Sequence, residues 1–149
     1  MNILPHLVVA LLAQSPDLKP AQAVKTLGGH KEDVYDVAFS PDGSKIAMVT
    51  NGDRFFQWRV VDVASGDVAD LQEFRPAPDF VTYIQFFDQF APSHQVWSSD
   101  STRVVFAGDI AGDGERLPDQ AWVIDASGTV EPVALAFASE AYFVPQGAP

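Results

Sequence analysis

The sequence predicts an all-β fold made of antiparallel four-stranded meanders. Three observations carry this prediction: short apolar runs are separated by tight turns, aromatic and β-branched residues are frequent, and one residue pattern recurs along the chain. Of the 149 residues, 47% are hydrophobic and eleven are Phe, whereas only two are Met. This composition suits packed sheets better than helices, and it argues against a disordered chain.

The first meander is predicted within residues 27–66. Its strands are runs rich in apolar, aromatic and β-branched residues, at 34–39, 46–49 and 55–63. Ser40-Pro41-Asp42-Gly43 forms the first turn, because Pro presets φ, Asp bonds its own backbone and Gly supplies a positive φ. Asn51-Gly52-Asp53 forms the second turn, and Asn-Gly is among the strongest hairpin signals.

The pattern of this meander returns later in the chain. Residues 39–48, FSPDGSKIAM, align with residues 97–106, WSSDSTRVVF, and a third start appears at residues 141–145, AYFVP. The matched aromatics Phe39, Trp97 and Phe143 are 58 and 46 residues apart. Repeats of about 40 to 50 residues built from short strands are typical of β-propeller blades, and we expect these aromatics to pack between blades.

The first unit resembles a WD40 repeat. Gly29-His30 precedes it, residues 37–43 (VAFSPDG) lie in its middle, and Val61-Asp62 takes the place of the family's Trp-Asp. The second unit, with WSSDS at 97–101 and AWVID at 121–125, is more similar to the WD40-like (PD40) repeats of bacterial TolB-type propellers. Val61 at the Trp place favours this second relationship.

This resemblance implies structural roles for one set of repeat residues. It also suggests a bacterial protein that is periplasmic or exported, although a cytoplasmic location stays open. It implies a non-catalytic module that contacts other proteins or serves structure. The alternative is an accessory propeller of a hydrolase, as in the prolyl-oligopeptidase family, or a fragment of a propeller enzyme. The structural repeat residues are His30, Phe39, Asp42, Asp53, Asp62, Trp97, Asp100 and Asp125.

The predicted organisation is a tail or short helix over residues 1–20, with a signal-like apolar run, followed by a partial β-propeller over residues 21–149. Its repeat units span about 27–90 and 91–136, and a further inner strand spans about 139–145. For the fourth strand of the first unit, residues 80–87 are favoured over 68–74, because they are the more β-prone. This amounts to about two and a half blades, whereas closed propellers have about four to eight. A protein partner, self-association or the rest of a longer chain would complete the ring.

The charge and residue content exclude several classes of function. The formal net charge of −11, with nine Lys and Arg, disfavours nucleic acid as a partner. The apolar run within residues 1–13 is too short for a membrane span. There is no cysteine for disulfides or thiolate metal sites, and no Gly-x-Ser-x-Gly nucleophile turn. No cofactor is expected.

Two loops carry candidate binding residues. The stretch before the second unit is the least repeat-like part of the chain, and surfaces for recognition often lie on such grafted loops. Its candidates are Phe87, Asp88, Gln89, Phe90 and His94. The second loop is rich in Gly and carries four carboxylates without the EF-hand spacing, so a solvated acidic loop is favoured over a calcium site. These weak calcium candidates are Asp109, Asp113, Glu115 and Asp119.

Overall fold

The computed structural model describes residues 7–9, 25–27, 34–51, 54–86, 94–110, 112 and 114–144. The chain divides into two compact units, residues 1–31 and 32–149. In the first, β1 (Leu7–Val9) pairs antiparallel with β2 (Lys25–Leu27). The described part of the N-terminal segment is therefore a strand, where the sequence predicted a helix or a tail.

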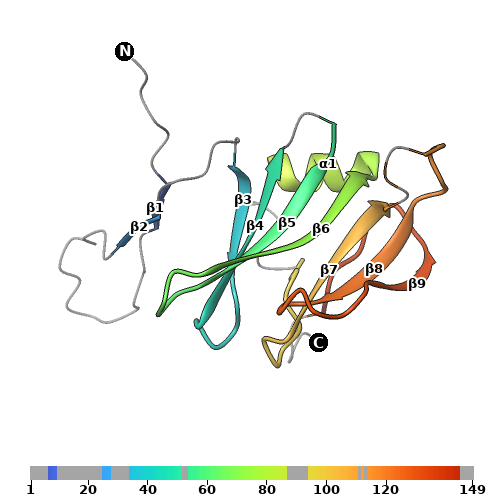
Figure 1. The fold of residues 1–149 in the computed structure, drawn as a ribbon. Helices are drawn as coiled ribbons and strands as arrows, with labels where there is room; N and C mark the ends of the chain where they lie inside the picture. The colour runs from blue at the N-terminus through green and yellow to red at the C-terminus, as the bar shows by residue number, and fades with distance from the viewer. Residues whose placement is uncertain are drawn as a thin grey trace, which may run out of the picture. The chain divides into compact units, whose positions relative to one another are not determined.

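The second unit confirms the all-β prediction. Seven antiparallel strands follow one another in a curled, half-barrel sheet with neighbours in chain order (Figure 1). The first four are β3 (Val34–Phe39), β4 (Lys45–Asn51), β5 (Phe56–Asp62) and β6 (Val68–Pro76). The last three are β7 (Arg103–Asp109), β8 (Gln120–Asp125) and β9 (Val133–Phe137). This arrangement is consistent with part of a propeller-like fold.

The prediction of a strand at residues 80–87 is wrong. Val68–Pro76 forms the fourth strand, and residues 78–85 form the helix α1 (Pro78–Gln85). Pro78 begins the helix, where its missing N–H costs nothing, and Asp79 lies in the first turn. The helix buries Phe80, Tyr83 and Ile84, which are spaced i, i+3 and i+4. The helical period therefore outweighed the β propensity of the individual residues.

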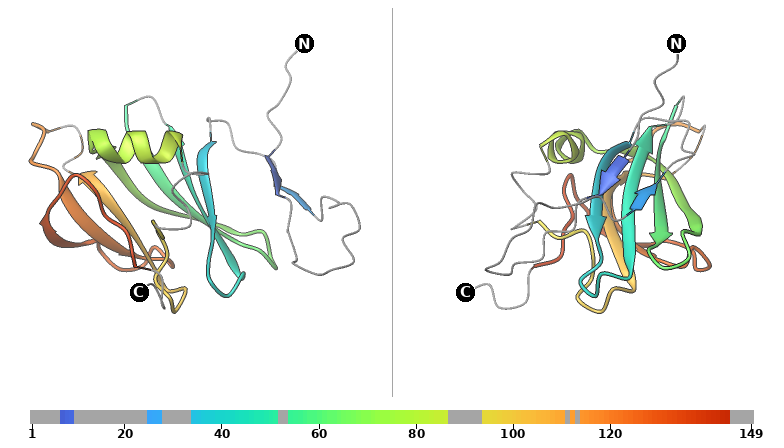
Figure 2. Two further views of the ribbon diagram at one scale, coloured as in Figure 1. Left: turned by 180° about the vertical axis from the view of Figure 1, so that it is seen from behind. Right: turned by 90° about the vertical axis from the view of Figure 1, so that its left-hand side faces the viewer.

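One hydrophobic core joins the strands of both meanders to α1. The centroid of the Phe74 ring on β6 lies 4.7 Å from that of the Phe106 ring on β7 and 5.9 Å from that of the Phe80 ring on α1. Trp58 on β5 stacks on the other side of Phe74, at 6.4 Å. All four rings are almost fully buried, and α1 lies across one face of the sheet (Figure 2). Such aromatic burial makes this cluster a main source of stability for the second unit.

The two meanders meet at the junction of β6 and β7, where Arg75 lies opposite Asp109 and Pro76 opposite Gly108. The Arg75 guanidinium donates to the Asp109 carboxylate at 2.6 Å, and that carboxylate is nearly fully buried. A Cβ atom at Gly108 would collide with the Arg75 carbonyl oxygen, so only glycine allows this close approach. The short, tightly packed pairing of β6 with β7 thus joins the two meanders into one seven-stranded sheet.

The aligned segments of the two meanders have the same backbone pairing. Phe39 lies opposite Ile46, and at the matched positions Trp97 lies opposite Val104. The next pair of strands also has matching register in the two meanders, since Lys45 lies opposite Asp62 and Arg103 lies opposite Asp125. The internal repeat of the sequence is therefore also a structural repeat within the described residues.

The aromatics at matched places do not share one environment. Trp97 is buried and its Nε1–H donates to the Ala38 carbonyl of the preceding meander at 2.9 Å, as expected for packing between units. Phe39 is 37% exposed. The backbone N–H of Phe143 donates to the Gln95 carbonyl in an antiparallel bridge. The C-terminal segment thus pairs with the segment that precedes Trp97.

Candidate functional site

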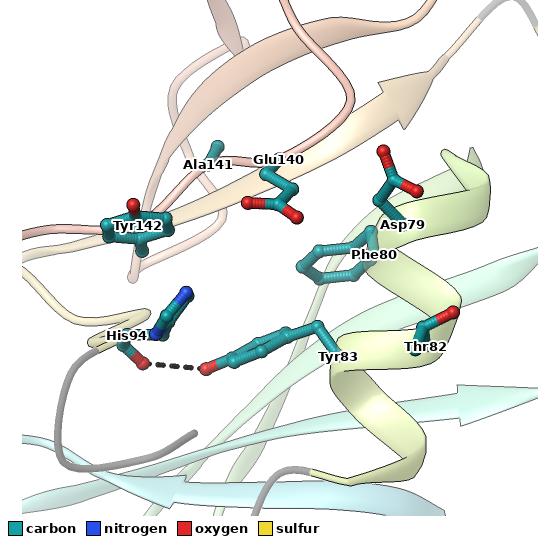
Figure 3. Close-up of a pocket in the computed structure, with 8 residues that line it drawn as sticks. All are labelled: Asp79, Phe80, Thr82, Tyr83, His94, Glu140, Ala141 and Tyr142. Atoms are coloured by element: carbon teal, nitrogen blue, oxygen red, sulfur yellow. Dashed lines mark hydrogen bonds between the residues drawn. The ribbon is translucent and has the colours of Figure 1, made fainter. Parts of the chain in front are cut away.

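A pocket of about 130 Å³ lies between α1, His94 and the C-terminal segment (Figure 3). The residues that line it come from three parts of the chain: residues 79–83, residue 94 and residues 140–142. Residues 79–83 and residue 94 lie outside the aligned segments of the repeat, whereas residues 141 and 142 belong to its third start. The lining residues are Asp79, Phe80, Thr82, Tyr83, His94, Glu140, Ala141 and Tyr142.

Helix α1 supplies the buried floor of the pocket. Phe80 and Tyr83 are on the face of α1 that meets the core, and their rings are 5.8 Å apart. The Tyr83 hydroxyl donates to the His94 carbonyl at 2.7 Å, which ties the helix to the segment that precedes Trp97. A buried tyrosine hydroxyl needs such a hydrogen-bond partner. The bond therefore fixes α1 and the segment that carries His94 relative to each other.

The far wall is made by two more rings. The His94 ring stacks at 5.6 Å on Tyr83, and the Tyr142 ring lies 4.1 Å from His94 on its other side. Phe80, Tyr83, His94 and Tyr142 therefore form a continuous row of rings. Tyr142 is 43% exposed, so the row runs from the core to the surface.

The rim of the pocket is acidic. Asp79 and Glu140 are both exposed, and Figure 3 shows their carboxylates on the same side of the pocket, beside Phe80. The third polar group of the rim, the Thr82 hydroxyl, bonds the Pro78 carbonyl of its own helix at 3.4 Å. Among the described residues that line the pocket, none is Lys or Arg. The arrangement therefore presents π-faces and negative charge to an occupant.

Of the five candidates predicted for partner binding, His94 lies in this pocket. Phe87, Asp88, Gln89 and Phe90 lie outside the described residues. Sequence reasoning missed the lining residues on α1 because it interpreted residues 80–87 as a strand. The helical spacing of Phe80, Tyr83 and Ile84 after Pro78-Asp79 was the signal that could have revealed the floor. No sequence signal joined Glu140 and Tyr142 to it.

The acidic loop between β7 and β8 contacts arginines. Asp109 accepts hydrogen bonds from Arg75 and from the Leu117 backbone N–H, at 2.6 and 3.0 Å. Asp119 pairs with Arg116 at 2.7 Å. Glu115 is exposed, and Asp113 lies outside the described residues. In the part of the chain that is described, no three His, Asp or Glu side chains gather as ligands for a metal ion.

The repeat aspartates Asp42 and Asp100 organise turns. The Asp42 carboxylate accepts hydrogen bonds from both the backbone and the hydroxyl of Ser44, and from the Ser40 hydroxyl. Asp100 makes the same three bonds with Thr102 and Ser98. The backbone bond from Ser44 is the largest cause that holds the pKa of Asp42 well below its usual value. The hydroxyl bond from Ser98, followed by those from Thr102, lowers the pKa of Asp100 to about 2.

Asp62 and Asp125 cap the second pair of turns in the same way. Asp62 accepts from the backbone N–H groups of Ala64 and Ser65, and Asp125 accepts from the backbone and hydroxyl of Ser127. These bonds lower the pKa of both carboxyls. His30 and Asp53, the other two repeat residues, lie outside the described residues.

Comparison with protein-family models, with curated proteins and with solved structures found no match. No helix among the described residues is long and apolar enough to cross a membrane.

Proposed function

We propose that this chain is a non-catalytic, propeller-like repeat module of the WD40-like, TolB-type class, and that it binds other proteins. The observation that carries the proposal is the position of the pocket. It lies beside α1, which interrupts the repeat between the two meanders, and in repeat scaffolds such departures are the usual place for recognition surfaces.

The size and lining of the pocket support recognition of a single side chain. Pockets for drug-sized ligands are about 300–1,000 Å³, whereas this one is about 130 Å³. Exposed aromatic rings such as Tyr142 are enriched at the centres of protein interfaces. A peptide segment that inserts one side chain between α1 and Tyr142 fits these dimensions.

The alternative, an accessory domain or fragment of a hydrolase, has less support. A nucleophilic site would need a Ser, a His and a carboxylate, and Ser93, His94, Asp88 and Asp100 are close in the sequence. Asp100 is engaged in its own turn, and Ser93 and Asp88 lie outside the described residues. His94 contacts the rings of Tyr83 and Tyr142. This environment suits packing against an aromatic occupant or a cation better than proton transfer from a hydroxyl.

The experiment is a selection of random peptides on the immobilised chain, followed by affinity measurements on the enriched sequences. We expect enriched peptides to lose about tenfold or more in affinity for the variant Tyr142→Ala. Phe137→Ala is the matched control, since Phe137 is an exposed aromatic on β9 and does not line the pocket. The proposal fails if no peptide is enriched, or if both variants bind like the unchanged chain.

A further inference from the structure

The pocket combines aromatic faces with negatively charged side chains at its rim. Four rings line one side of it, the carboxylates of Asp79 and Glu140 lie at its rim, and no Lys or Arg is among its described lining residues. The chain as a whole carries a net charge of −11. Both the local and the overall electrostatics therefore favour a positively charged occupant.

The geometry explains why a long basic side chain fits better than a free cation. A methylene stem can lie against the apolar surface of Phe80 and Tyr83, which are buried at the floor. The charged end then reaches the exposed ring of Tyr142 and the carboxylates of the rim. A cation within about 6 Å of an aromatic centroid is attracted by the ring quadrupole, and this attraction grows when water is partly excluded.

We propose that the pocket binds the side chain of a Lys or Arg residue presented by a protein partner. The inference rests on the proposed function and deepens it, because it states which chemistry the partner presents. Glu140 and Asp79 supply the charge, and the row of rings from Phe80 to Tyr142 supplies the apolar and cation–π contacts.

The test uses small probes that isolate the side-chain chemistry. n-Butylammonium and n-butylguanidinium represent Lys and Arg, and n-butanol is the neutral probe of similar length. The aromatic ring signals of Tyr83, His94 and Tyr142 are followed by NMR during each titration. We expect saturable shifts with one or both cations, at affinities at least about threefold tighter than for butanol. Comparison of the two cations distinguishes Lys from Arg.

Charge-neutralising variants supply the second part of the test. Glu140→Gln keeps the shape of the side chain, and we expect it to weaken cation binding by about three- to tenfold. Glu131→Gln is the matched control, because Glu131 is also exposed but does not line the pocket. The affinity of the unchanged chain should also fall as salt is raised, since the rim is exposed to solvent.

The outcomes separate this inference from the proposed function. If butanol and the cations produce equal shifts, or if Glu140→Gln binds the cations as the unchanged chain does, the inference is overturned. Should selected peptides still bind and depend on Tyr142 in that case, the protein-binding function survives with a different side chain in the pocket. If the cations bind but no peptide is enriched, the proposed function fails instead.

Discussion

At the scale of single residues, hydrogen-bonded aspartates define the turns of both meanders. Ser40, Asp42 and Ser44 form one network, and Ser98, Asp100 and Thr102 form its counterpart 58 residues later. The left-handed position of the turn is Gly43 in the first and Ser101 in the second. Ser101 also links the two turns, because its hydroxyl accepts a hydrogen bond from the backbone N–H of Asp42 in the first turn.

The lowered pKa of Asp100 predicts a dependence of stability on pH. A carboxyl whose pKa falls on folding stabilises the protein above its unfolded pKa, near 4, and loses this effect as pH falls through the folded pKa of about 2. We therefore expect Asp100→Asn to be less stable than the unchanged chain at pH 7, and the difference to shrink between about pH 4 and pH 2. Urea unfolding at a series of pH values measures it.

Asp67→Asn is the control for this experiment, because Asp67 is an exposed aspartate whose side chain is outside the Asp42 and Asp100 networks. Its effect should stay within about 0.5 kcal/mol at every pH. A constant difference between Asp100→Asn and the unchanged chain from pH 7 to pH 2 would contradict the assignment.

The hydrogen bond from Trp97 to Ala38 predicts a second effect at this scale. Trp97→Phe removes the indole N–H of a buried side chain and leaves the half-buried Ala38 carbonyl with one donor fewer, so we expect a loss of about 1–3 kcal/mol in the free energy of unfolding. Trp122→Phe is the matched control: its indole bonds Gly108 within the second meander and is half-buried, so its loss should be smaller. Equal losses would show that the contact between meanders has no special weight.

At the scale of elements, the pairing of β6 with β7 depends on an ion pair. Arg75→Met leaves the buried Asp109 carboxylate without its guanidinium, and we expect a loss of about 3–5 kcal/mol. Arg59→Met removes a comparable pair whose partner, Asp70, is 61% exposed, and should cost no more than about 1 kcal/mol. Thermal unfolding of the two variants side by side makes the comparison. Similar costs for both would mean that the junction does not depend on this pair.

The elements also show what sequence reasoning can and cannot reach. The hairpin around Asp42 was predicted residue by residue, because turn chemistry is local and Pro, Asp, Gly and Ser each act on their own backbone. The hairpin around Asp100 followed from the alignment of the two units. Helix α1 was missed because Phe, Val, Tyr and Ile are β-prone, and burial against the core decided their conformation. Of the residues that line the pocket, the sequence predicted only His94 as a binding residue. Tyr83 and Tyr142 lie beside His94 through tertiary contacts, which the sequence does not reveal.

At the scale of the whole second unit, two similar meanders share one core, and helix α1, which is not part of the repeat, packs on it. Trp58 and Phe74 from the first meander pack with Phe106 from the second and with Phe80 of α1. The same helix therefore stabilises the junction and provides the floor of the pocket. This coupling gives the proposed binding surface a rigid support, which lowers the entropic cost of binding.

The most direct measurement of the central claim is a backbone NMR shift map of the chain saturated with a selected peptide. The account predicts that the largest shifts fall on residues 79–83, on His94 and on residues 140–142, because these residues line the pocket. The turns around Asp42 and Asp125 should remain unchanged, since they lie outside the lining residues. Shifts confined to β9 or to the turns, with the pocket residues unaffected, would contradict it.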